Sequence, residues 1–387
     1  MPKSKTTQKP VSVLFHSDSG DPDMLYFSRF DACDPYLAFS IGKKKFAIAP
    51  DMEYGRMARE SAFDEILLLS EVKKGAARRF KLPKEKGPSI SQLVRHVAKV
   101  YKISSFRVGN RFPAGLAFKL KDAGIKIEIA GDEGLFPERI IKTADEVAAL
   151  RKGNEASSAG FRAVAKVLAE SKEKNGKLVY EGKVLTAERL RELIAQAALG
   201  KGAIALHTIA SPGDQAVDCH NAGYGPIRPG ELIVVDIFPR RAEDGYWGDM
   251  TRTFLKGKAS DAQKRLVRTV KEAHAVSLEM IKPGASGGKV HRAVEDFFVK
   301  EGYETTRDNG DLKGFFHALG HGIGLEVHET PVLHAKADWR FKKGMVVTTE
   351  PGLYYLGLGG VRIEDTVHLI PGGNELLSKA PYKWQIA

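Results

Sequence analysis

FFHALGHGIGLEVHETP, residues 315–331, contains three histidines: His317, His321 and His328. Glycines stand on both sides of the middle histidine, and glycine allows a close approach of neighbouring backbone. A single buried histidine is more often a hydrogen-bonded core residue than a metal ligand. Three histidines in one stretch favour a ligand among them, provided that carboxylates elsewhere in the chain share the same metal.

Two aspartates interrupt strand-like sequence upstream of the histidines. Asp236 follows apolar residues in LIVVDIF, and Asp249 lies in YWGDMTRTF. PRRAEDG between them is typical of a hairpin loop, so the two carboxylates can face each other across paired strands. Like charges at that distance raise one pKa unless a cation neutralises them, and a divalent metal is the simplest cation. The alternative is that Asp249 is a turn or capping residue and that Asp236 pairs with Arg240 or Arg252.

Two glutamates repeat this arrangement: Glu350 in VVTTEPGLYY and Glu364 in VRIEDTVHL. Buried unpaired charges are costly, so four carboxylates in buried strands need cations. Four carboxylates and one imidazole fit two divalent ions, and we expect manganese before cobalt, iron or zinc. Paired metals roughly 3.5–4 Å apart share a water or hydroxide, which they turn into a nucleophile, and they also act as Lewis acids.

Composition indicates an ordinary globular protein of 387 residues, 43% of them hydrophobic. The two cysteines, Cys33 and Cys219, form no CxxC pair, so we expect a reducing compartment, the cytoplasm, and we interpret Cys219 as a packed residue rather than a nucleophile. The basic start MPKSKTTQKP is not followed by the apolar segment of a secretory signal. No apolar run approaches the roughly 18–20 residues of a membrane span, so we expect no membrane partner.

The net charge of +12 raises the question of nucleic-acid binding. The excess lies in residues 1–142, which carry 26 Lys and Arg against 17 Asp and Glu, whereas residues 143–387 carry 34 against 31. It is concentrated in Lys43 to Lys45 and in KKGAARRFKLPKEK, residues 73–86, which we interpret as a solvated turn and a mobile loop. Aromatic residues do not alternate with these basic residues, as they do on surfaces that stack the bases of single-stranded nucleic acid. We therefore do not expect nucleic acid as a partner.

Residues 11–135 alternate short strands and helices, and they predict a small α/β domain after a disordered tail at 1–10. The predicted strands are 11–17, 35–41, 45–50, 64–70, 106–109 and 125–130, and the predicted helices are 52–63, 90–103 and 113–124. GDEGLFPERII, residues 131–141, is the predicted linker.

Residues 143–387 repeat one plan, two helices followed by antiparallel strands. Capping boxes open the first helix of each half at Thr143 and Ser260, and Thr186 and Ser286 open the second. The strands that follow hold the aspartates in the first half, and the histidines and glutamates in the second. This pattern predicts two halves packed around a shared sheet.

The motifs VVDIF, GDMTRTF, GHGIGLEVHE, TTEPGLY and GGVRIEDT, in this order, resemble those of the pita-bread metallopeptidases. That family includes methionine aminopeptidase, aminopeptidase P and prolidase. The likeness covers residues 143–387, and the residues before them resemble the N-terminal domain of aminopeptidase P, prolidase and creatinase. It implies an α/β (α+β) protein, with a creatinase-like domain at 11–135 and a pita-bread catalytic domain of two pseudo-twofold halves at 143–387.

The resemblance also implies a metal centre of five residues. Asp236 chelates one metal, Asp249 and Glu364 bridge both, and His321 and Glu350 ligate the other. Glu350 is also the implied base that takes the proton of the bridging water. The resemblance, and not the spacing, selects His321 over His317 as the ligand.

Four more residues receive implied roles at the substrate. His328 stabilises the tetrahedral intermediate, and His220 contacts the substrate near the scissile bond. His317 lies near the residue that follows this bond, and Arg362 supports Glu364 and the end of the substrate. His317, Arg362 and the N-terminal domain favour the proline-cleaving members over methionine aminopeptidase.

The sequence thus predicts a dinuclear-metal exopeptidase that hydrolyses the bond before proline through a metal-bridging hydroxide. It would be an Xaa-Pro aminopeptidase or an Xaa-Pro dipeptidase, acting on peptides with proline at the second position. Relatives are commonly homodimers, and we expect one here. Two alternatives stay open: a metallopeptidase of this fold without proline specificity, and a non-catalytic binding module of this fold. The five filled ligand positions argue against the second.

Overall fold

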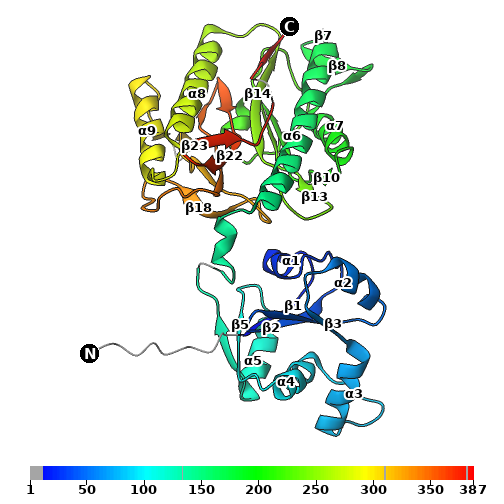
Figure 1. Ribbon diagram of the computed structural model, residues 1–387. Helices are drawn as coiled ribbons and strands as arrows, with labels where there is room; N and C mark the ends of the chain where they lie inside the picture. The colour runs from blue at the N-terminus through cyan, green and yellow to red at the C-terminus, as the bar shows by residue number, and fades with distance from the viewer. Residues whose placement is uncertain (1–11, 133, 309–310, 381) are drawn as a thin grey trace, which may run out of the picture. The chain divides into compact units, whose positions relative to one another are not determined.

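A computed structural model describes residues 12–132, 134–308, 311–380 and 382–387. The chain divides into two compact units between Pro137 and Glu138, within the stretch predicted as a linker. The predicted tail, residues 1–10, lies outside the described residues. Figure 1 shows the elements of each unit.

The N-terminal unit is a six-stranded sheet with a hydrophobic core on each face. The sheet order is β4-β3-β2-β1-β5-β6, in which only β2 runs antiparallel to its neighbours. Successive side chains on a strand face opposite sides, so Phe39 joins one core and Ala38 the other. The strands are β1 Ser12–Ser17, β2 Tyr36–Ile41, β3 Lys44–Ala49, β4 Glu65–Leu68, β5 Ser105–Val108 and β6 Lys126–Ile129. The helices are α1 Pro22–Ser28, α2 Tyr54–Glu60, α3 Leu69–Phe80, α4 Ile90–Val100 and α5 Ala114–Asp122.

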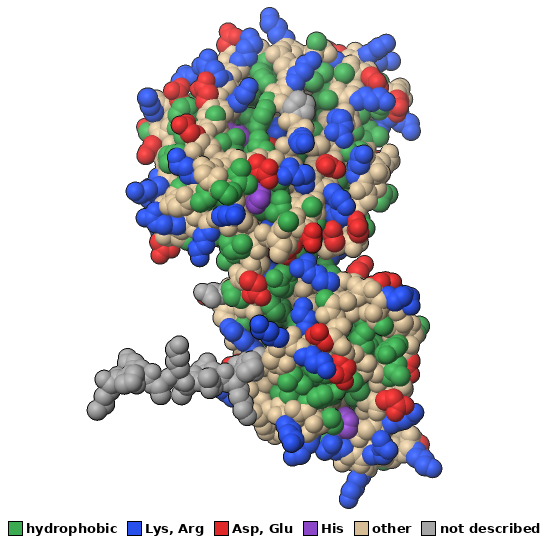
Figure 2. Space-filling model, in the orientation of Figure 1, with side chains coloured by type: hydrophobic (Ala, Val, Ile, Leu, Met, Phe, Trp, Pro, Cys, Tyr) green, Lys and Arg blue, Asp and Glu red, His purple; other side chains and the backbone are tan. Residues whose placement is uncertain are grey.

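The basic run at residues 73–86 differs from its prediction. We expected a mobile loop, but helix α3 continues through Phe80. Val72 and Ala76, one turn apart, are buried and hold the helix against the sheet, while its lysines and arginines stay at the surface. Figure 2 shows one side of the protein, where Lys and Arg side chains are scattered over both units among Asp and Glu side chains.

The C-terminal unit contains four long helices, as the capping signals predicted. They are α6 Ala144–Glu170, α7 Ala187–Leu199, α8 Asp261–Met280 and α9 Gly287–Lys300. Thr143 and Ser260 each complete a capping box, in which their hydroxyls accept a backbone N–H and the N3 side chain bonds back. The helices pack in pairs, α6 with α7 and α8 with α9. Among the described residues, no helix combines the length and apolar character that crossing a membrane requires.

The strands of this unit form two main sheets instead of the one shared sheet that we predicted. The first is β11-β12-β14-β24, and the second is β18-β17-β19-β22-β23. An isolated bridge between Thr251 and Glu364 joins them, and each helix pair packs on a separate core, with Leu255 of β14 also contributing to the core of the second pair. The strands of the two sheets are β11 Ile209–Pro212, β12 Ile233–Ile237, β14 Met250–Lys256, β24 Gln385–Ile386, β17 Gly320–Gly322, β18 Glu329–Leu333, β19 Val346–Thr349, β22 Asp365–Ile370 and β23 Gly373–Leu376.

Smaller elements complete the unit. The short strands are β7 Lys172–Lys174, β8 Lys177–Tyr180, β9 Lys183–Val184, β10 Ala203–Ile204, β13 Arg240–Arg241, β15 Thr306–Asp308, β16 Asp311–Lys313, β20 Gly352–Tyr355 and β21 Gly359–Arg362. The 3-10 helices are η1 Pro137–Ile140 and η2 Gly213–Val217.

Replacing Gly153 in α6 by alanine should destabilise the C-terminal unit by about 1–3 kcal/mol. The new Cβ would lie 2.6 Å from Gly248 N and 2.7 Å from Trp247 C, backbone atoms that cannot rotate away. This clash outweighs the roughly 1 kcal/mol that alanine gains over glycine in a helix. Gly160→Ala in the same helix is the matched control, because its nearest atom is a side-chain methyl of Ile237. Urea unfolding should show the larger loss for Gly153→Ala, and equal losses would contradict the backbone contact.

Candidate active site

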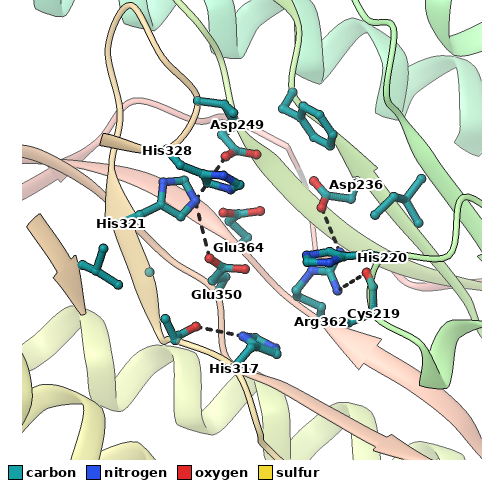
Figure 3. Close-up of a pocket in the computed structure, with 16 residues that line it drawn as sticks. Cys219, His220, Asp236, Asp249, His317, His321, His328, Glu350, Arg362 and Glu364 are labelled. Atoms are coloured by element: carbon teal, nitrogen blue, oxygen red, sulfur yellow. Dashed lines mark hydrogen bonds and ion pairs between the residues drawn. The ribbon is translucent and has the colours of Figure 1, made fainter. Parts of the chain in front are cut away.

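One cavity of about 290 Å³ in the C-terminal unit brings together all nine predicted site residues. Figure 3 shows the carboxylates of Asp249, Glu350 and Glu364 gathered beside the His321 ring, with His317 lying apart from them. The nine are His220, Asp236, Asp249, His317, His321, His328, Glu350, Arg362 and Glu364.

The two aspartates lie on neighbouring antiparallel strands. Asp236 in β12 stands opposite Thr251 of β14, and Asp249 comes immediately before β14. Residues two apart on a strand share a face, so Asp249 and Asp236 are diagonal neighbours rather than directly opposed.

Asp236 pairs with an arginine that we did not predict as its partner. Arg362 Nη2 donates to Asp236 Oδ2 at 2.8 Å. Of the two arginines named as alternatives, Arg252 instead pairs with Asp365. The guanidinium reaches Asp236 from the second half of the unit, so the pair ties the two halves together.

His321 presents a neutral nitrogen to the carboxylates. Its Nδ1 lies 3.0 Å from Gly322 O, and since a carbonyl only accepts, Nδ1 carries the proton. Nε2 is then the free acceptor, 3.5 Å from Glu350 Oε1 and 3.6 Å from Asp249 Oδ2. Burial lowers the pKa of His321 to about 4, which keeps the ring uncharged at neutral pH.

Glu364 enters the cavity from the second half of the unit. Its N–H donates to Thr251 O at 3.0 Å, and Thr251 Oγ1 donates to Glu364 Oε2 at 2.8 Å. One ligand atom each from Asp249, His321 and Glu364 lie within 4.8 Å of one another. These three buried residues could hold a metal ion, with Glu350 beside His321.

The cavity carboxylates resist ionisation. Burial raises the pKa of Asp249 and of Glu364 well above the ordinary values, and neighbouring carboxylates raise them further. Burial likewise raises the pKa of Glu350 to about 8. Arg362 alone does not offset these effects, so as it stands the cluster holds protons at neutral pH.

Two other buried carboxylates of the same unit behave in the opposite way. Lys142 and Arg139 lower the pKa of Glu329 in spite of its burial, and Arg252 does the same for Asp365. The chain therefore supplies cations where a buried carboxylate is structural. Within the cavity, the neighbouring side chains supply too little positive charge for the carboxylates, and a bound metal ion would supply the rest.

The donor set fits divalent cations. It combines carboxylate oxygens with one neutral imidazole nitrogen, the ligands that borderline and hard divalent ions prefer. Asp236 Oδ1 is buried without a hydrogen-bond partner among the described residues. An unsatisfied buried carboxylate oxygen is costly, and a cation would remove that cost.

His317 faces away from this donor set. Its Nδ1 lies 2.8 Å from Ala318 O, and its Nε2 lies 3.0 Å from Tyr354 Oη. Arg362 Nη1 also donates to Tyr354 Oη, at 2.8 Å. His317 and Arg362 are thus joined through a buried phenol.

His328 and His220 lie at the more open side of the cavity. The His328 ring packs edge-on against His321, with centroids 4.4 Å apart, and partial burial lowers the pKa of His328. His220 is exposed on a loop. Its neighbour Cys219 also lines the cavity, where burial raises the pKa of the thiol, which disfavours a nucleophilic role.

Three residues that position the site were missing from our prediction. Thr251 bonds Glu364, Tyr354 bonds His317, and Asn154 of α6 accepts the N–H of Asp249 at 3.3 Å. Thr251 and Tyr354 lie within motifs already noted, two residues after Asp249 and two after Gly352. Nothing in the sequence around Asn154 marks it, since it contacts the site only through the tertiary fold.

Comparison with known proteins gives a family match. The model of metallopeptidase family M24 matches residues 148–370. The Xaa-Pro dipeptidase of Pyrococcus horikoshii is 30% identical over 282 residues, 72% of this chain and 74% of that protein. The Xaa-Pro dipeptidase of Pyrococcus furiosus is 32% identical over 245 residues, 62% of this chain and 64% of that protein.

Solved structures share the fold along nearly the whole chain. The X-Pro aminopeptidase of Thermotoga maritima superposes with a TM-score of 0.80 at 23% identity, covering 98% of each chain. The prolidase of Pyrococcus furiosus gives a TM-score of 0.75 at 23% identity, covering 96% of this chain and 97% of that one. These likenesses confirm the predicted pita-bread fold.

The metal-free protein should lose stability as the pH rises from 6.5 to 8. Glu350 has a folded-state pKa of about 8 against an ordinary 4.5, so here the folded chain holds a proton that the unfolded chain has released. The free energy of unfolding therefore falls with pH, by about 1–2 kcal/mol over this window. Buried neutral histidines act oppositely, but most of their effect lies below their ordinary pKa of about 6.5, and Glu350→Gln retains all of them.

Thermal unfolding after chelator treatment measures this loss, and Glu350→Gln is the matched control that removes the titrating group. Added Mn²⁺ should raise the melting temperature of the wild-type protein more at pH 8 than at pH 6.5, because a metal binds the ionised carboxylates. Equal pH dependence in both proteins would show that Glu350 does not carry the extra proton.

Proposed function

Because the chain belongs to metallopeptidase family M24, we propose that it is an exopeptidase that hydrolyses the peptide bond before proline. It would act as an Xaa-Pro dipeptidase or an Xaa-Pro aminopeptidase. The observation that carries this proposal is the cavity itself, where buried carboxylates lacking sufficient cations surround a neutral imidazole. The names of the similar Pyrococcus proteins support the choice of proline.

The proposed cofactor is a pair of divalent ions, with manganese before cobalt, iron or zinc. Asp249 and Glu364 would contact both ions, Asp236 would hold one, and His321 and Glu350 would hold the other. When bound, the ions would supply a water nucleophile at neutral pH and polarise the scissile carbonyl.

Glu350 is the proposed general base. Most of its side chain is buried, with 17% exposed, and its Oε1 lies 3.5 Å from the neutral Nε2 of His321. A carboxylate in this position would take a proton from the attacking water and pass it to the leaving nitrogen. Its raised pKa without metal shows that this environment tolerates the protonated form.

His328 and His220 are the proposed donors to the developing oxyanion and to the substrate near the scissile bond. The lowered pKa of His328 leaves its ring neutral at pH 7, so one nitrogen carries a proton to donate. A donor aimed at charge that appears only in the transition state lowers the barrier without tightening substrate binding.

The substrate would lie along the side of the cavity that His317 and Arg362 share. His317 Nε2 accepts a hydrogen bond from Tyr354 Oη, and Arg362 donates one to it, which fixes the positions of both residues. Apolar Val327 and Val332 also line the cavity. These surfaces suit a proline ring, which is apolar and donates no backbone hydrogen bond.

The proposed setting is a cytoplasmic homodimer. Both cysteines are free thiols, as a reducing compartment would keep them. The dimer is proposed from the resemblance to the family, and light scattering on the purified protein would test it.

Asp249→Asn should lower kcat/KM for Ala-Pro by at least about 1,000-fold, or about 4 kcal/mol of barrier. Removing one of several crowded carboxyl groups whose ionisation the cavity disfavours should leave the metal-free protein as stable as the wild type or more so. Glu181→Gln is the control, because it removes a carboxylate from an exposed ion pair with Arg189. Undiminished cleavage by Asp249→Asn would refute the assignment.

A peptide panel tests the substrate class. Proline-specific and unspecific cleavage can be distinguished with four peptides: Ala-Pro, Ala-Pro-Ala, Ala-Ala and Met-Ala-Ala. We expect cleavage only where proline is the second residue. Preference between Ala-Pro and Ala-Pro-Ala distinguishes a dipeptidase from an aminopeptidase. Equal cleavage of Ala-Ala would favour the alternative without proline specificity.

A further inference from the structure

Glu329 is a buried carboxylate immediately after His328. It does not line the cavity, and its side chain is only 7% exposed. Lys142 Nζ lies 2.9 Å from Glu329 Oε2, and Arg139 pairs with Oε1. Both cations precede helix α6, in the segment that opens the C-terminal unit.

The same carboxylate bonds the backbone of the loop that leads to His328. The N–H groups of Leu325 and Glu326 donate to Glu329 Oε1 at 3.0 and 3.2 Å. Gly324 makes room for it, since a Cβ there would lie 2.7 Å from both carboxylate oxygens. Two loop donors and two cations thus converge on one side chain.

The opposite side of this loop is held by Trp247. Its backbone N–H donates to Gly324 O at 3.0 Å, and its indole Nε1 donates to Leu325 O at 3.1 Å. Trp247 lies two residues before Asp249. Two loop N–H groups therefore bond Glu329, and two loop carbonyls bond Trp247 in the segment that carries Asp249.

We propose that Glu329 is a positioning residue for His328. Its carboxylate, charged and held by Lys142 and Arg139, fixes the loop at residues 324–328 and so sets the His328 ring against His321. The role in catalysis rests on the proposed function, whereas the effect on the loop does not. Between its two anchored ends the loop places Val327 and His328 in the cavity wall.

An ion pair that served only stability would leave a different signature. Loss of a purely structural contact would lower stability, metal binding and activity together. Loss of a positioning contact should instead free the loop amides and slow the chemical step, while the carboxylates and His321 still bind metal.

Glu329→Gln tests the proposal. The amide keeps the shape but loses the charge that Lys142 and Arg139 neutralise. We expect kcat for Ala-Pro to fall about 10–100-fold, the range typical of residues that orient catalytic groups. KM, and Mn²⁺ affinity by calorimetry, should change less than about threefold. Hydrogen exchange should speed up at Leu325 and Glu326.

Glu326→Gln is the matched control, because its carboxylate meets the same Arg139 from a side chain that is 34% exposed. It should keep kcat within about threefold of the wild type. The double variant Lys142→Met/Glu329→Gln removes the stranded buried cation, so it should regain stability without regaining kcat.

The outcomes separate the two proposals. Unchanged exchange at Leu325 and Glu326 in Glu329→Gln would overturn the loop contact, and faster exchange with unchanged kcat would overturn the positioning role. A joint fall of kcat and Mn²⁺ affinity would show a structural ion pair instead. A wild-type protein that cleaves no Xaa-Pro peptide would defeat the proposed function alone, because exchange is measured without substrate.

Discussion

Burying several carboxylates together without enough cations is the constraint on which the C-terminal unit depends. Each such group would be neutral or paired in an ordinary core. Glu329 and Asp365 obey that rule, with cations that lower their pKa. Asp249, Glu350 and Glu364 lack such cations and, without a metal, stay neutral by holding protons around one cavity. This arrangement lowers the stability of the metal-free protein, and a cation bound in the cavity would restore that stability.

The two-sheet architecture is what makes such crowding attainable. Two separate hydrophobic cores, one under each helix pair, hold the strands that carry the cavity residues. The halves meet where Thr251 pairs with Glu364, and the hydroxyl of Thr251 orients that carboxylate. Groups more than 100 positions apart in sequence are thereby fixed by backbone pairing, which is stiffer than contact between loops.

Local signals in the sequence predict much of this fold, and tertiary contacts decide the rest. The helix starts at Thr143 and Ser260 can be predicted from the sequence, because a capping box is complete within four residues. The carboxylates and histidines of the cavity are visible as charges within apolar strands. The contact between Arg362 and Asp236 was not predicted, because the two residues are 126 positions apart and only the tertiary fold brings them together. The helix after Leu68 was missed because a dense run of basic residues hides its two buried positions.

The histidine stretch shows how one local rule yields two chemical roles. His317 and His321 each place Nδ1 against the carbonyl of the next residue, so each offers Nε2 to its surroundings. For His321 the surroundings are carboxylates, because neighbouring strands approach closely at Gly320 and Gly322. For His317 they are the phenol of Tyr354. The backbone thus fixes the tautomer of both rings, and position along the stretch alone decides which ring faces a cation and which faces a hydrogen-bond donor.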